Sequence, residues 1–464
     1  MEKILVVNSN LYRQDMIDKY LSGIKILKCG DLQQSNAFVI GLSNDINDII
    51  NCNLKYVLGQ NSLNSNASVN FFDLDELENV YLRIANDFIN IDKKVLLYLG
   101  KFPGFGFDID GGSILARQLI DTLKYRTQLD LAFIRKNKEE YSDDSVHCVS
   151  YYKYLDAFNN KFTRRLENLN TNLSAVTNYE DYDIIITAHV SKFFFPCKMK
   201  EDFWNKTILF PMFCTKSYER AGEIVPKDYF ELEKEVIKSV KKIITPSIAE
   251  RDDLINDYNV SNSKIDVIFR GISENIKYRE RSNIGETIRL VSIGSIKKQK
   301  NNIMQLKILK QLVDSGSDAI LHIVTTIQDL QVYEEMKEFI SKNDLYTKVC
   351  FHFSLPQSEL ALLLDSCDIN ISTANWETFG RGIFEGISAG LPTLVSKKLL
   401  AVKDIVGENA GVFFLDSVRD FVDCISQLKD NSKYQVASQS VYKIISKVSY
   451  KQEQKMLVHS ILNT

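Results

Sequence analysis

The chain has 464 residues, of which 45% are hydrophobic, so it is long enough for two or three domains with apolar cores. Its 57 lysines and arginines nearly balance 60 aspartates and glutamates, which argues against a nucleic-acid-binding protein with a strongly basic surface. No apolar run approaches the roughly 20 residues of a membrane span, and Met1–Asn8 lacks the apolar stretch and cleavage site of a signal peptide.

The eight cysteines are scattered along the chain and form no Cys-x-x-Cys pair. This pattern favours reduced thiols in a cytoplasmic protein over a disulfide framework. No cluster of histidine, cysteine and aspartate has the spacing of a structural metal site, so no metal is expected.

Residues 1–92 are interpreted as an N-terminal extension, a small α/β domain of its own. The segment Asn61–Asn70 is rich in asparagine and serine and predicts a loop. The remaining pattern predicts a helix over Leu74–Phe88 and strands at Lys3–Val7, Ile24–Leu27, Phe38–Leu42 and Tyr56–Leu58.

Residues 93–270 alternate between strand-like and helix-like segments. Such alternation predicts a Rossmann-like domain with a parallel sheet covered by helices on both faces. The predicted strands are Val95–Leu99, Leu129–Ile134, Asp183–Thr187, Thr207–Phe213, Lys242–Thr245 and Ile265–Phe269, and the predicted helices are Ile114–Lys124, Ala157–Ala175, Tyr229–Val240 and Ile248–Tyr258.

A polar, charged segment at residues 270–286 predicts a linker, after which the alternation begins again. Residues 271–430 are therefore a second Rossmann-like domain, and residues 431–464 are an amphipathic, helical tail. Its predicted elements are the strands Ile288–Ile293, Ile320–Val324, Val349–Phe353, Cys367–Ser372, Thr393–Ser396 and Val412–Leu415, and the helices Asn302–Asp314, Leu330–Ser341, Ser358–Cys367 and Val418–Leu428.

The most informative segment is residues 377–392, where Glu377 and Glu385 lie on either side of a glycine-containing turn. A strand precedes this segment, a short amphipathic helix carries the second glutamate, and Gly390-Leu391-Pro392 ends the helix. The N–H groups and dipole at a helix N-terminus bind anions. Two carboxylates beside such an anion site suit a nucleotide-sugar, with a diphosphate at the helix and hydroxyl groups on the carboxylates.

This segment resembles the donor-site motif of retaining glycosyltransferases of family four, which have the GT-B fold. In that motif two glutamates are separated by seven residues, Phe-Gly follows the first, and Gly-x-Pro follows the helix; all of these features are present here. The resemblance extends more weakly over residues 93–430. It implies two Rossmann-like domains facing a cleft, with the acceptor domain first, the donor domain second, and the tail packing back on the first domain.

The resemblance also implies roles for the motif residues. Glu385 accepts hydrogen bonds from ribose hydroxyls, and the catalytic residue Glu377 holds a hydroxyl of the transferred sugar. The backbone around the donor-binding residues Phe379, Gly380, Arg381 and Gly382 lies near the diphosphate. The alternative for both glutamates is an ordinary solvated position.

A second motif, Ser292–Asn301, ends the first strand of the donor domain. The family pattern is Gly-Arg followed by lysine, so Gly294 and Lys300 match while Ser295 replaces the arginine. In the family, arginine and lysine flank the diphosphate and stabilise the leaving nucleotide. Lys297, Lys298 or Arg381 could substitute for the missing arginine. The alternative for Lys300 is an exposed lysine.

Two features of the first domain are weaker. His189 follows a strand where family members often carry a histidine, so it lies either near the sugar or in a purely structural position. The loop Gly104–Gly112 supplies Gly111 and Gly112 as donor-binding glycines.

Asp108-Ile109-Asp110 resembles a metal motif, which we interpret as coincidence because GT-B enzymes usually need no metal. Phe193-Phe194-Phe195-Pro196 could contact a membrane or lipid-linked acceptor, although a buried anchor is the simpler interpretation.

The resemblance therefore predicts transfer of a hexose-type sugar from a nucleotide-diphosphate-sugar, expected to be a UDP-sugar, to an acceptor hydroxyl with retention of configuration. The expected acceptor is a glycan, glycolipid or glycoprotein in bacterial surface glycan synthesis, with no cofactor, no metal and no nucleic acid. The expected location is the cytoplasm or the inner face of the membrane, and the oligomeric state is open. Selectivity is expected in the loops Thr325–Gln328, Ser354–Gln357 and Ala374–Trp376.

Two alternatives come from other classes. One is a non-catalytic, glycosyltransferase-like subunit that binds a partner or glycan, motivated by Ser295 and by residues 1–92. The other is a sugar-nucleotide epimerase on the same fold, which would form product without an acceptor.

Overall fold

A computed structural model of the protein describes residues 4–7, 25–28, 38–42, 54–58, 69–72, 93–99, 111–123, 127–135, 147–152, 178–189, 201–220 and 222–462. It divides into two units, Met1–Lys93 with Leu123–Gln128, and Lys94–Thr122 with Leu129–Thr464. Among the described residues, no helix is long and apolar enough to cross a membrane.

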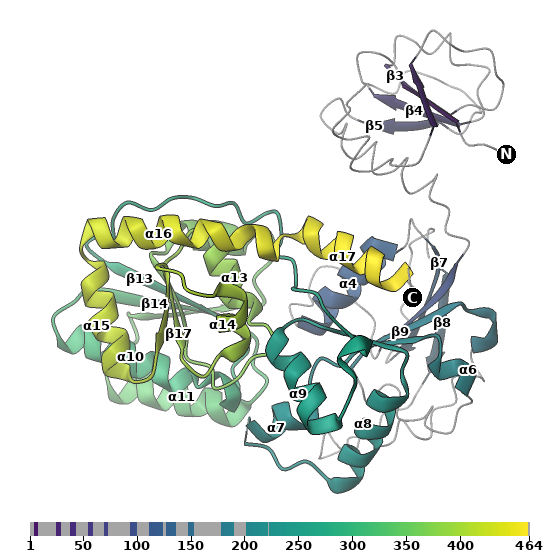
Figure 1. Cartoon of the computed structure of the whole chain (residues 1–464). Coiled ribbons are helices and arrows are strands. Elements are labelled where there is room, and N and C mark those ends of the chain that lie inside the picture. Colours follow the sequence, from purple (N-terminus) through teal and green to yellow (C-terminus); the bar gives the residue numbers. More distant parts are fainter. Residues whose placement is uncertain are drawn as a thin grey trace. The chain divides into compact units, whose positions relative to one another are not determined.

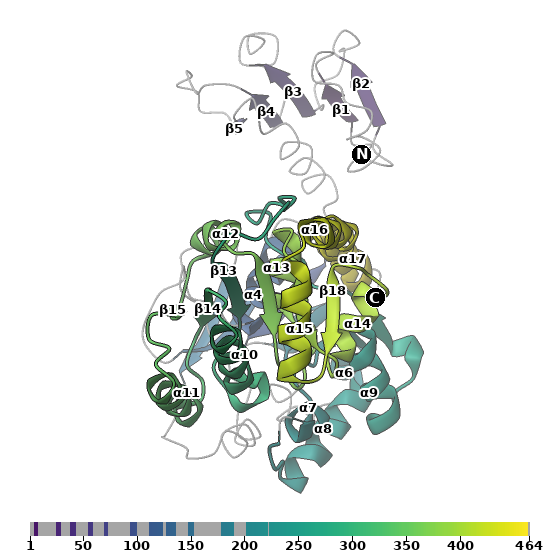
Figure 2. The same ribbon diagram turned by 90° about the vertical axis from the view of Figure 1, so that its left-hand side faces the viewer.

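The N-terminal unit contains a five-stranded parallel sheet. Its strands are β1 (Ile4–Val7), β2 (Lys25–Lys28), β3 (Phe38–Leu42), β4 (Leu54–Leu58) and β5 (Val69–Phe72). They follow one another in the order β2-β1-β3-β4-β5, as Figure 2 shows, and every neighbouring pair is parallel. This is the strand order of flavodoxin-like, doubly wound sheets.

The second unit begins with a seven-stranded sheet in the order β12-β11-β10-β9-β6-β7-β8. The order reverses direction between β6 and β9, which pair in parallel, so the switch point of this sheet lies between them. The strands are β6 (Lys94–Leu99), β7 (Gln128–Arg135), β8 (His147–Tyr152), β9 (Ile184–Ala188), β10 (Thr207–Phe210), β11 (Lys242–Thr245) and β12 (Ile265–Val267), and the helices are α4 (Gly111–Leu123), α6 (Glu201–Trp204), α7 (Thr215–Arg220), α8 (Lys227–Ser239) and α9 (Ile248–Tyr258).

A six-stranded parallel sheet follows in the order β15-β14-β13-β16-β17-β18, with its switch point between β13 and β16. The strands are β13 (Ile288–Ile293), β14 (Ala319–Thr325), β15 (Val349–Phe353), β16 (Ile369–Ser372), β17 (Thr393–Ser396) and β18 (Val412–Leu415), and the helices are α10 (Asn302–Asp314), α11 (Leu330–Lys342), α12 (Gln357–Ser366), α13 (Arg381–Ser388), α14 (Leu400–Val406), α15 (Val418–Leu428), α16 (Asn431–Ile445) and α17 (Tyr450–Leu462).

Helices cover both faces of this second sheet. Alternate strand residues point to opposite sides, so neighbouring residues of one strand enter different cores. On β13, Leu290 packs in a core with residues of α10, α11 and α15, while Val291 packs in another core with residues of α12, α13 and α14. This arrangement is the parallel sheet with two covered faces that the alternating sequence predicts.

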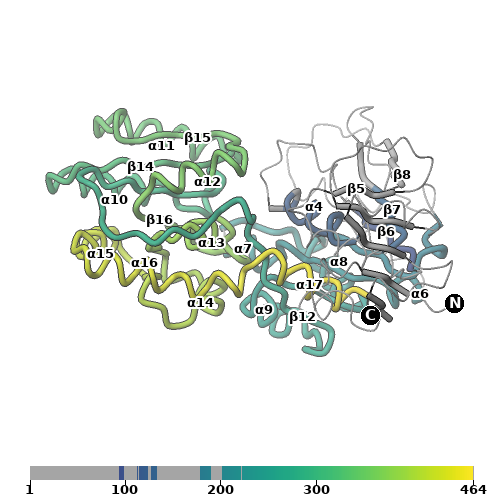
Figure 3. Tube along the Cα trace, turned by 90° about the horizontal axis from the view of Figure 1, so that it is seen from above, coloured from purple at the N-terminus to yellow at the C-terminus, as the bar shows by residue number. Residues whose placement is uncertain are grey.

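The C-terminal helices run from the second domain to the first and are drawn in yellow in Figure 1 and Figure 3. Tyr434 and Val441 of α16 are buried in the cores of the second domain. Ser460 of α17 accepts a hydrogen bond at its carbonyl from Lys242 Nζ (3.0 Å), and its hydroxyl donates to Asp266 of the first sheet. The tail therefore joins the two Rossmann-like domains.

Several element boundaries differ from the sequence prediction. The strand predicted over Thr207–Phe213 ends at Phe210, because Pro211 has no N–H with which to continue the ladder. The predicted loop Asn61–Asn70 overlaps strand β5, and the strand predicted to Phe269 ends at Val267. The short helices α6, α7 and α14 and the strands β5 and β8 were not predicted.

Other predictions lie outside the described residues. They are the helices Leu74–Phe88 and Ala157–Ala175, the glycines and Asp-x-Asp of residues 104–110, and the aromatic segment Phe193–Pro196.

Candidate active site

The switch point of the second sheet brings together the loops after β13 and β16. Lys300 lies in the first loop and Glu377 in the second, and the ammonium of Lys300 is hydrogen-bonded to Oε1 of Glu377. Both side chains are largely buried, with 17% and 12% of their surfaces exposed. Ligands of open α/β sheets bind at this kind of position, outside the carboxyl ends of the strands.

Further hydrogen bonds hold these two loops together. Gln299 donates its side-chain amide to the carbonyl of Trp376, and Asn375 donates its N–H to the carbonyl of Gln299 at 2.9 Å. The Thr373 hydroxyl is 2.9 Å from the carbonyl of Asn301. The sequence analysis missed these residues as positioning groups. The only signal was polar side chains immediately after two predicted strands, and it cannot distinguish positioning from solvation.

Helix α13 begins at the same switch point. Gly380, which precedes it, has a φ of +88°, a conformation that glycine adopts without strain. A Cβ on Gly382 would lie 2.4 Å from the carbonyl oxygen of Ile293, so only glycine allows the first turn of α13 to approach the end of β13 this closely. The free N–H groups of this helix N-terminus form a potential anion site.

Glu385 lies one turn into α13 and is only 3% exposed. Gln357 Nε2 and Arg381 Nε each lie 3.3 Å from its Oε1 atom. No described residue donates to Oε2, which is therefore available to accept a hydrogen bond from a ligand. Burial raises the pKa of Glu385, and the positive charge of Arg381 acts against that increase.

The other predicted donor-domain residues differ in their surroundings. Gly294 donates its N–H to the carbonyl of Val324 (2.9 Å), and the Ser295 hydroxyl accepts a long hydrogen bond of 3.4 Å from Thr326. Phe379 is 4% exposed and stacks on Phe384 at 4.6 Å between ring centroids. The ring of Phe379 therefore belongs to the core.

The three cations proposed to replace the missing arginine are placed differently. Lys297 Nζ lies 5.1 Å from the ring centroid of Phe213, and Lys298 is exposed. Arg381 contacts Glu385 and donates through Nη1 to the carbonyl of Gly271 at 3.1 Å. The Lys300 ammonium is therefore the cation that the structure places against Glu377.

In the first domain, His189 follows β9 at the switch point of that sheet. Its φ is +89°, which is strained for a residue with a side chain, and its N–H donates to the carbonyl of Phe210 at 2.7 Å. Its ring Nε2 is 3.2 Å from the Tyr218 hydroxyl. Gly111 and Gly112 are the first residues of α4, which follows the neighbouring strand β6.

An aromatic contact joins the two domains beside these groups. Phe213 of the first domain and Trp376 of the second are arranged edge to face, with 5.0 Å between ring centroids. Trp376 directly precedes Glu377, so this contact connects the first domain to the loop that carries the glutamate. The sequence analysis assigned neither aromatic residue a role in joining the domains.

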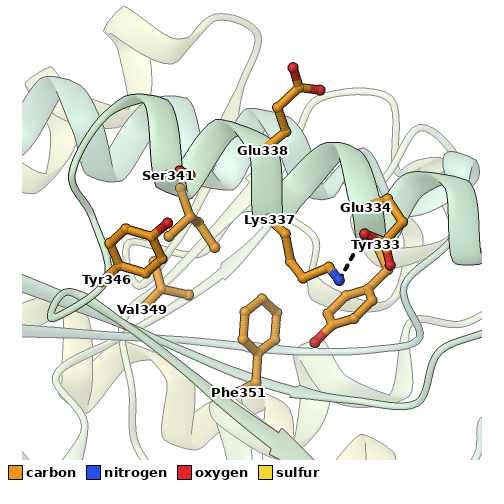
Figure 4. Close-up of a pocket in the computed structure, with 9 residues that line it drawn as sticks. Tyr333, Glu334, Lys337, Glu338, Ser341, Tyr346, Val349 and Phe351 are labelled. Carbon is orange, nitrogen blue, oxygen red and sulfur yellow. Dashed lines mark ion pairs between the residues drawn. The ribbon is translucent and has the colours of Figure 1, made fainter.

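A hollow of about 570 Å³ lies elsewhere, between α11 and the edge strand β15 (Figure 4). Tyr333 and Phe351 form aromatic walls with 5.6 Å between ring centroids, and Lys337 is paired with Glu334 at 2.7 Å. None of the predicted site residues lines it. Within the described part of the chain, no group of three or more histidine, cysteine, aspartate and glutamate side chains is placed to hold a metal ion.

Two Rossmann-like domains, each with a switch point in its sheet, define a protein of the GT-B fold. Residues 274–443 match the model of the family described as Glycosyl transferases group 1. The match contains Lys300, Glu377 and Glu385 and ends before α17.

Solved structures extend the similarity over both domains. The crystal structure of Anabaena Alr3699/HepE in complex with UDP and glucose is 12% identical and covers 80% of this chain and 99% of that chain, with a TM-score of 0.61. Sucrose-phosphate synthase (tll1590) from Thermosynechococcus elongatus is 12% identical and covers 79% and 98%, with a TM-score of 0.67. At these identities the likeness establishes the fold.

A curated relative is the MMP alpha-(1->4)-mannosyltransferase of Mycolicibacterium hassiacum, which is 22% identical over 179 residues. The matched region spans 39% of this chain and 42% of that relative's length.

Proposed function

We propose that the protein is a glycosyltransferase that moves a sugar from a nucleotide-diphosphate-sugar to an acceptor hydroxyl with retention of configuration. The observation that carries this proposal is the meeting of Lys300 and Glu377 at the switch point, beside the N-terminus of α13 and its buried Glu385. The match of residues 274–443 to the glycosyl transferases group 1 model supports the same reaction class.

The proposal assigns diphosphate binding to the positively charged groups and sugar binding to the two glutamates. The N–H groups at the start of α13 and the Lys300 ammonium bind the diphosphate and stabilise the negative charge that develops on it as the glycosidic bond breaks. Oε2 of Glu385 accepts a hydrogen bond from a ribose hydroxyl, and Glu377 accepts one from the transferred sugar. In the bound state Glu377 therefore exchanges part of its contact with Lys300 for the sugar.

Retention follows from a front-side displacement in this proposal. The acceptor oxygen bonds to the anomeric carbon on the face from which the diphosphate leaves, and the departing phosphate oxygen takes the acceptor proton. The protein then positions the reactants and stabilises charge. Because Lys300 and the helix N-terminus supply the positive charge, the transfer is proposed to need no metal. His189, at the facing switch point, is proposed to contact the transferred sugar.

A UDP-sugar is the proposed donor, supported by the fold shared with the Anabaena protein solved with UDP and glucose. The proposed acceptor is a glycan, glycolipid or glycoprotein of bacterial surface glycan synthesis, and the proposed location is the cytoplasm, including the inner face of the membrane. A second candidate function, a non-catalytic glycan-binding subunit, is favoured by Ser295, which leaves the diphosphate without the usual arginine.

The test is release of nucleoside diphosphate from UDP-, GDP- and ADP-sugars, with and without a mixture of glycan and glycolipid acceptors. Acceptor-dependent release that Glu377→Gln abolishes is the expected result. Binding of a nucleotide-sugar without turnover would favour the non-catalytic subunit, and conversion of the donor sugar without an acceptor would indicate an epimerase. Failure to bind any nucleotide-sugar would overturn the proposal.

A further inference from the structure

Arg381 touches two parts of the molecule that lie far apart in the sequence. Its Nε atom is 3.3 Å from Oε1 of Glu385, one helical turn further along α13. Its Nη1 atom donates to the carbonyl of Gly271 at 3.1 Å, at the point where the chain passes from the first domain to the second. The side chain is 20% exposed, so both contacts are partly buried.

The Gly271 peptide is itself held from several sides. Gln118 of α4 donates to the same carbonyl at 3.1 Å, and the Gly271 N–H donates to Glu453 of α17 at 2.8 Å. A Cβ on Gly271 would lie 2.4 Å from the Cα atom of Tyr450, so the backbone of α17 packs directly against it. The carbonyl that Arg381 contacts is therefore a fixed point at the domain crossing.

Glu385 has little else to hold it in place. Its second neighbour is the neutral amide of Gln357, which also reaches Oε1. The charged groups around Arg381 are Glu385 itself and, beyond the crossing peptide, the buried pair of Arg270 and Glu453. Arg381 is the cation that reaches Glu385, and neither contact uses Oε2.

We propose that Arg381 is a positioning residue that anchors the donor carboxylate Glu385 to the Gly271 peptide, so that donor binding depends on the join between the two domains. This inference rests on the proposed function. Arg381 does not then replace the arginine missing at Ser295, because its guanidinium is already engaged by Glu385 and Gly271. It sets the orientation and charge of the group that binds the ribose.

The charge has a measurable consequence. Burial raises the pKa of Glu385, and Arg381 opposes that increase. Without Arg381 the carboxyl group keeps its proton to a higher pH, and a protonated carboxyl loses acceptor strength toward a ribose hydroxyl. Donor affinity should fall as the solution is made more acidic. In the variant this fall should begin at a higher pH than in the wild type.

The experiment is calorimetric binding of UDP, GDP, ADP and CDP to the full chain between pH 5 and pH 9, for the wild type, Arg381→Met and Arg381→Gln. The control is Arg419→Met, because Arg419 also pairs with a carboxylate four residues further along its helix (Asp423, 3.6 Å) but is 84% exposed. We expect the Arg381 variants to bind roughly tenfold to a hundredfold more weakly at pH 7, as for loss of a charged hydrogen bond, with the acid decline moved to higher pH.

Arg419→Met should bind like the wild type throughout. An Arg381→Met protein with the affinity and pH profile of the wild type would overturn the inference. If circular dichroism shows that Arg381→Met is unfolded, the test uses Arg381→Gln, which keeps a hydrogen-bond donor and removes the charge. If the affinity of Arg381→Gln then falls at the same pH as that of the wild type, the inference is overturned. If the wild type binds none of the four nucleotides, the proposed function itself fails.

Discussion

Each Rossmann-like domain buries carboxylates, but it surrounds them differently. In the first domain Glu233 is fully buried and accepts hydrogen bonds from the Tyr258 hydroxyl and from the N–H of Thr215 at 2.8 Å. Glu250 is 3% exposed, and no described group donates to either of its oxygens. In the second domain Glu385 is as deeply buried, yet it pairs with Arg381 and lies one turn into α13, the helix that follows the loop of Glu377.

The comparison teaches that burial of a carboxylate does not identify a site. Glu233 ties α8 to α7 and α9, which is a structural task. Burial raises the pKa of Glu250 to about 8, so this carboxyl group is neutral at pH 7 and the cost of an unpaired buried charge is avoided. Of these three carboxylates, Glu385 alone combines burial with a hydrogen-bonded arginine, an oxygen to which no described residue donates, and a position in the first turns of α13. The predictions below test whether this distinction holds.

The largest effect is expected at Glu250. The folded protein keeps this proton up to pH about 8, whereas the unfolded chain releases it near its ordinary value of 4.5, so stability falls as the pH rises across that window. Glu250→Gln removes the penalty. We expect its free energy of unfolding, relative to the wild type, to increase by up to about 5 kcal/mol between pH 4.5 and pH 8.5.

Urea denaturation at the two pH values measures this difference. Exposed Glu274→Gln is the control and should change stability equally at both pH values. An equal effect of Glu250→Gln at both would show that Glu250 is ionised in the folded protein.

The next effect is expected at Lys300, because the proposal makes its ammonium the main cation at the diphosphate. Lys300→Met should lower the turnover of donor by roughly a hundredfold to a thousandfold, as for loss of a charge-stabilising group. The matched control is Lys310→Met on α10, where the lysine also pairs with a carboxylate, Asp314, at the surface. Equal turnover in the two variants would show that Lys300 does not stabilise the leaving diphosphate.

A smaller effect is expected at the glycines that bring α13 against the sheet. A Cβ on Gly386 would lie 2.4 Å from the side chain of Asn370, whereas the nearest atom to a Cβ on Gly285 is 3.8 Å away. Gly386→Ala should therefore cost about 1–3 kcal/mol of stability through overpacking. Gly285→Ala should be nearly neutral. Thermal denaturation compares them, and equal melting temperatures would show that α13 does not pack closely on β16.

The alternation of apolar and polar segments was sufficient to predict the strands and most of the helices of the second domain, although α14 was missed. The predicted helix Asn302–Asp314 agrees with α10, and Val418–Leu428 agrees with α15, where Ser417 and Asp420 form a capping box. Such caps are local signals that the sequence carries. The strand after Thr207 was predicted too long because apolar residues continue past Pro211.

Contacts between distant residues could not be predicted in this way. The motif spacing identified Arg381 as part of the site, but its partner Gly271 is 110 residues away in the sequence. The motif also named Phe379, whose ring the fold uses in the core. A single sequence shows which residues are neighbours along the chain. The contacts between distant residues depend on how two sheets and a C-terminal helix pack together.

The most direct test of the central claim is calorimetric binding of UDP, GDP, ADP and CDP to the wild type, to Glu385→Gln and to Glu250→Gln. The account predicts that at least one nucleotide binds the wild type. It also predicts that Glu385→Gln weakens binding tenfold or more, since a charged acceptor for the ribose is lost, while Glu250→Gln leaves affinity unchanged. Absence of binding to the wild type, or equal affinities in the wild type and Glu385→Gln, would contradict the assignment of the donor site.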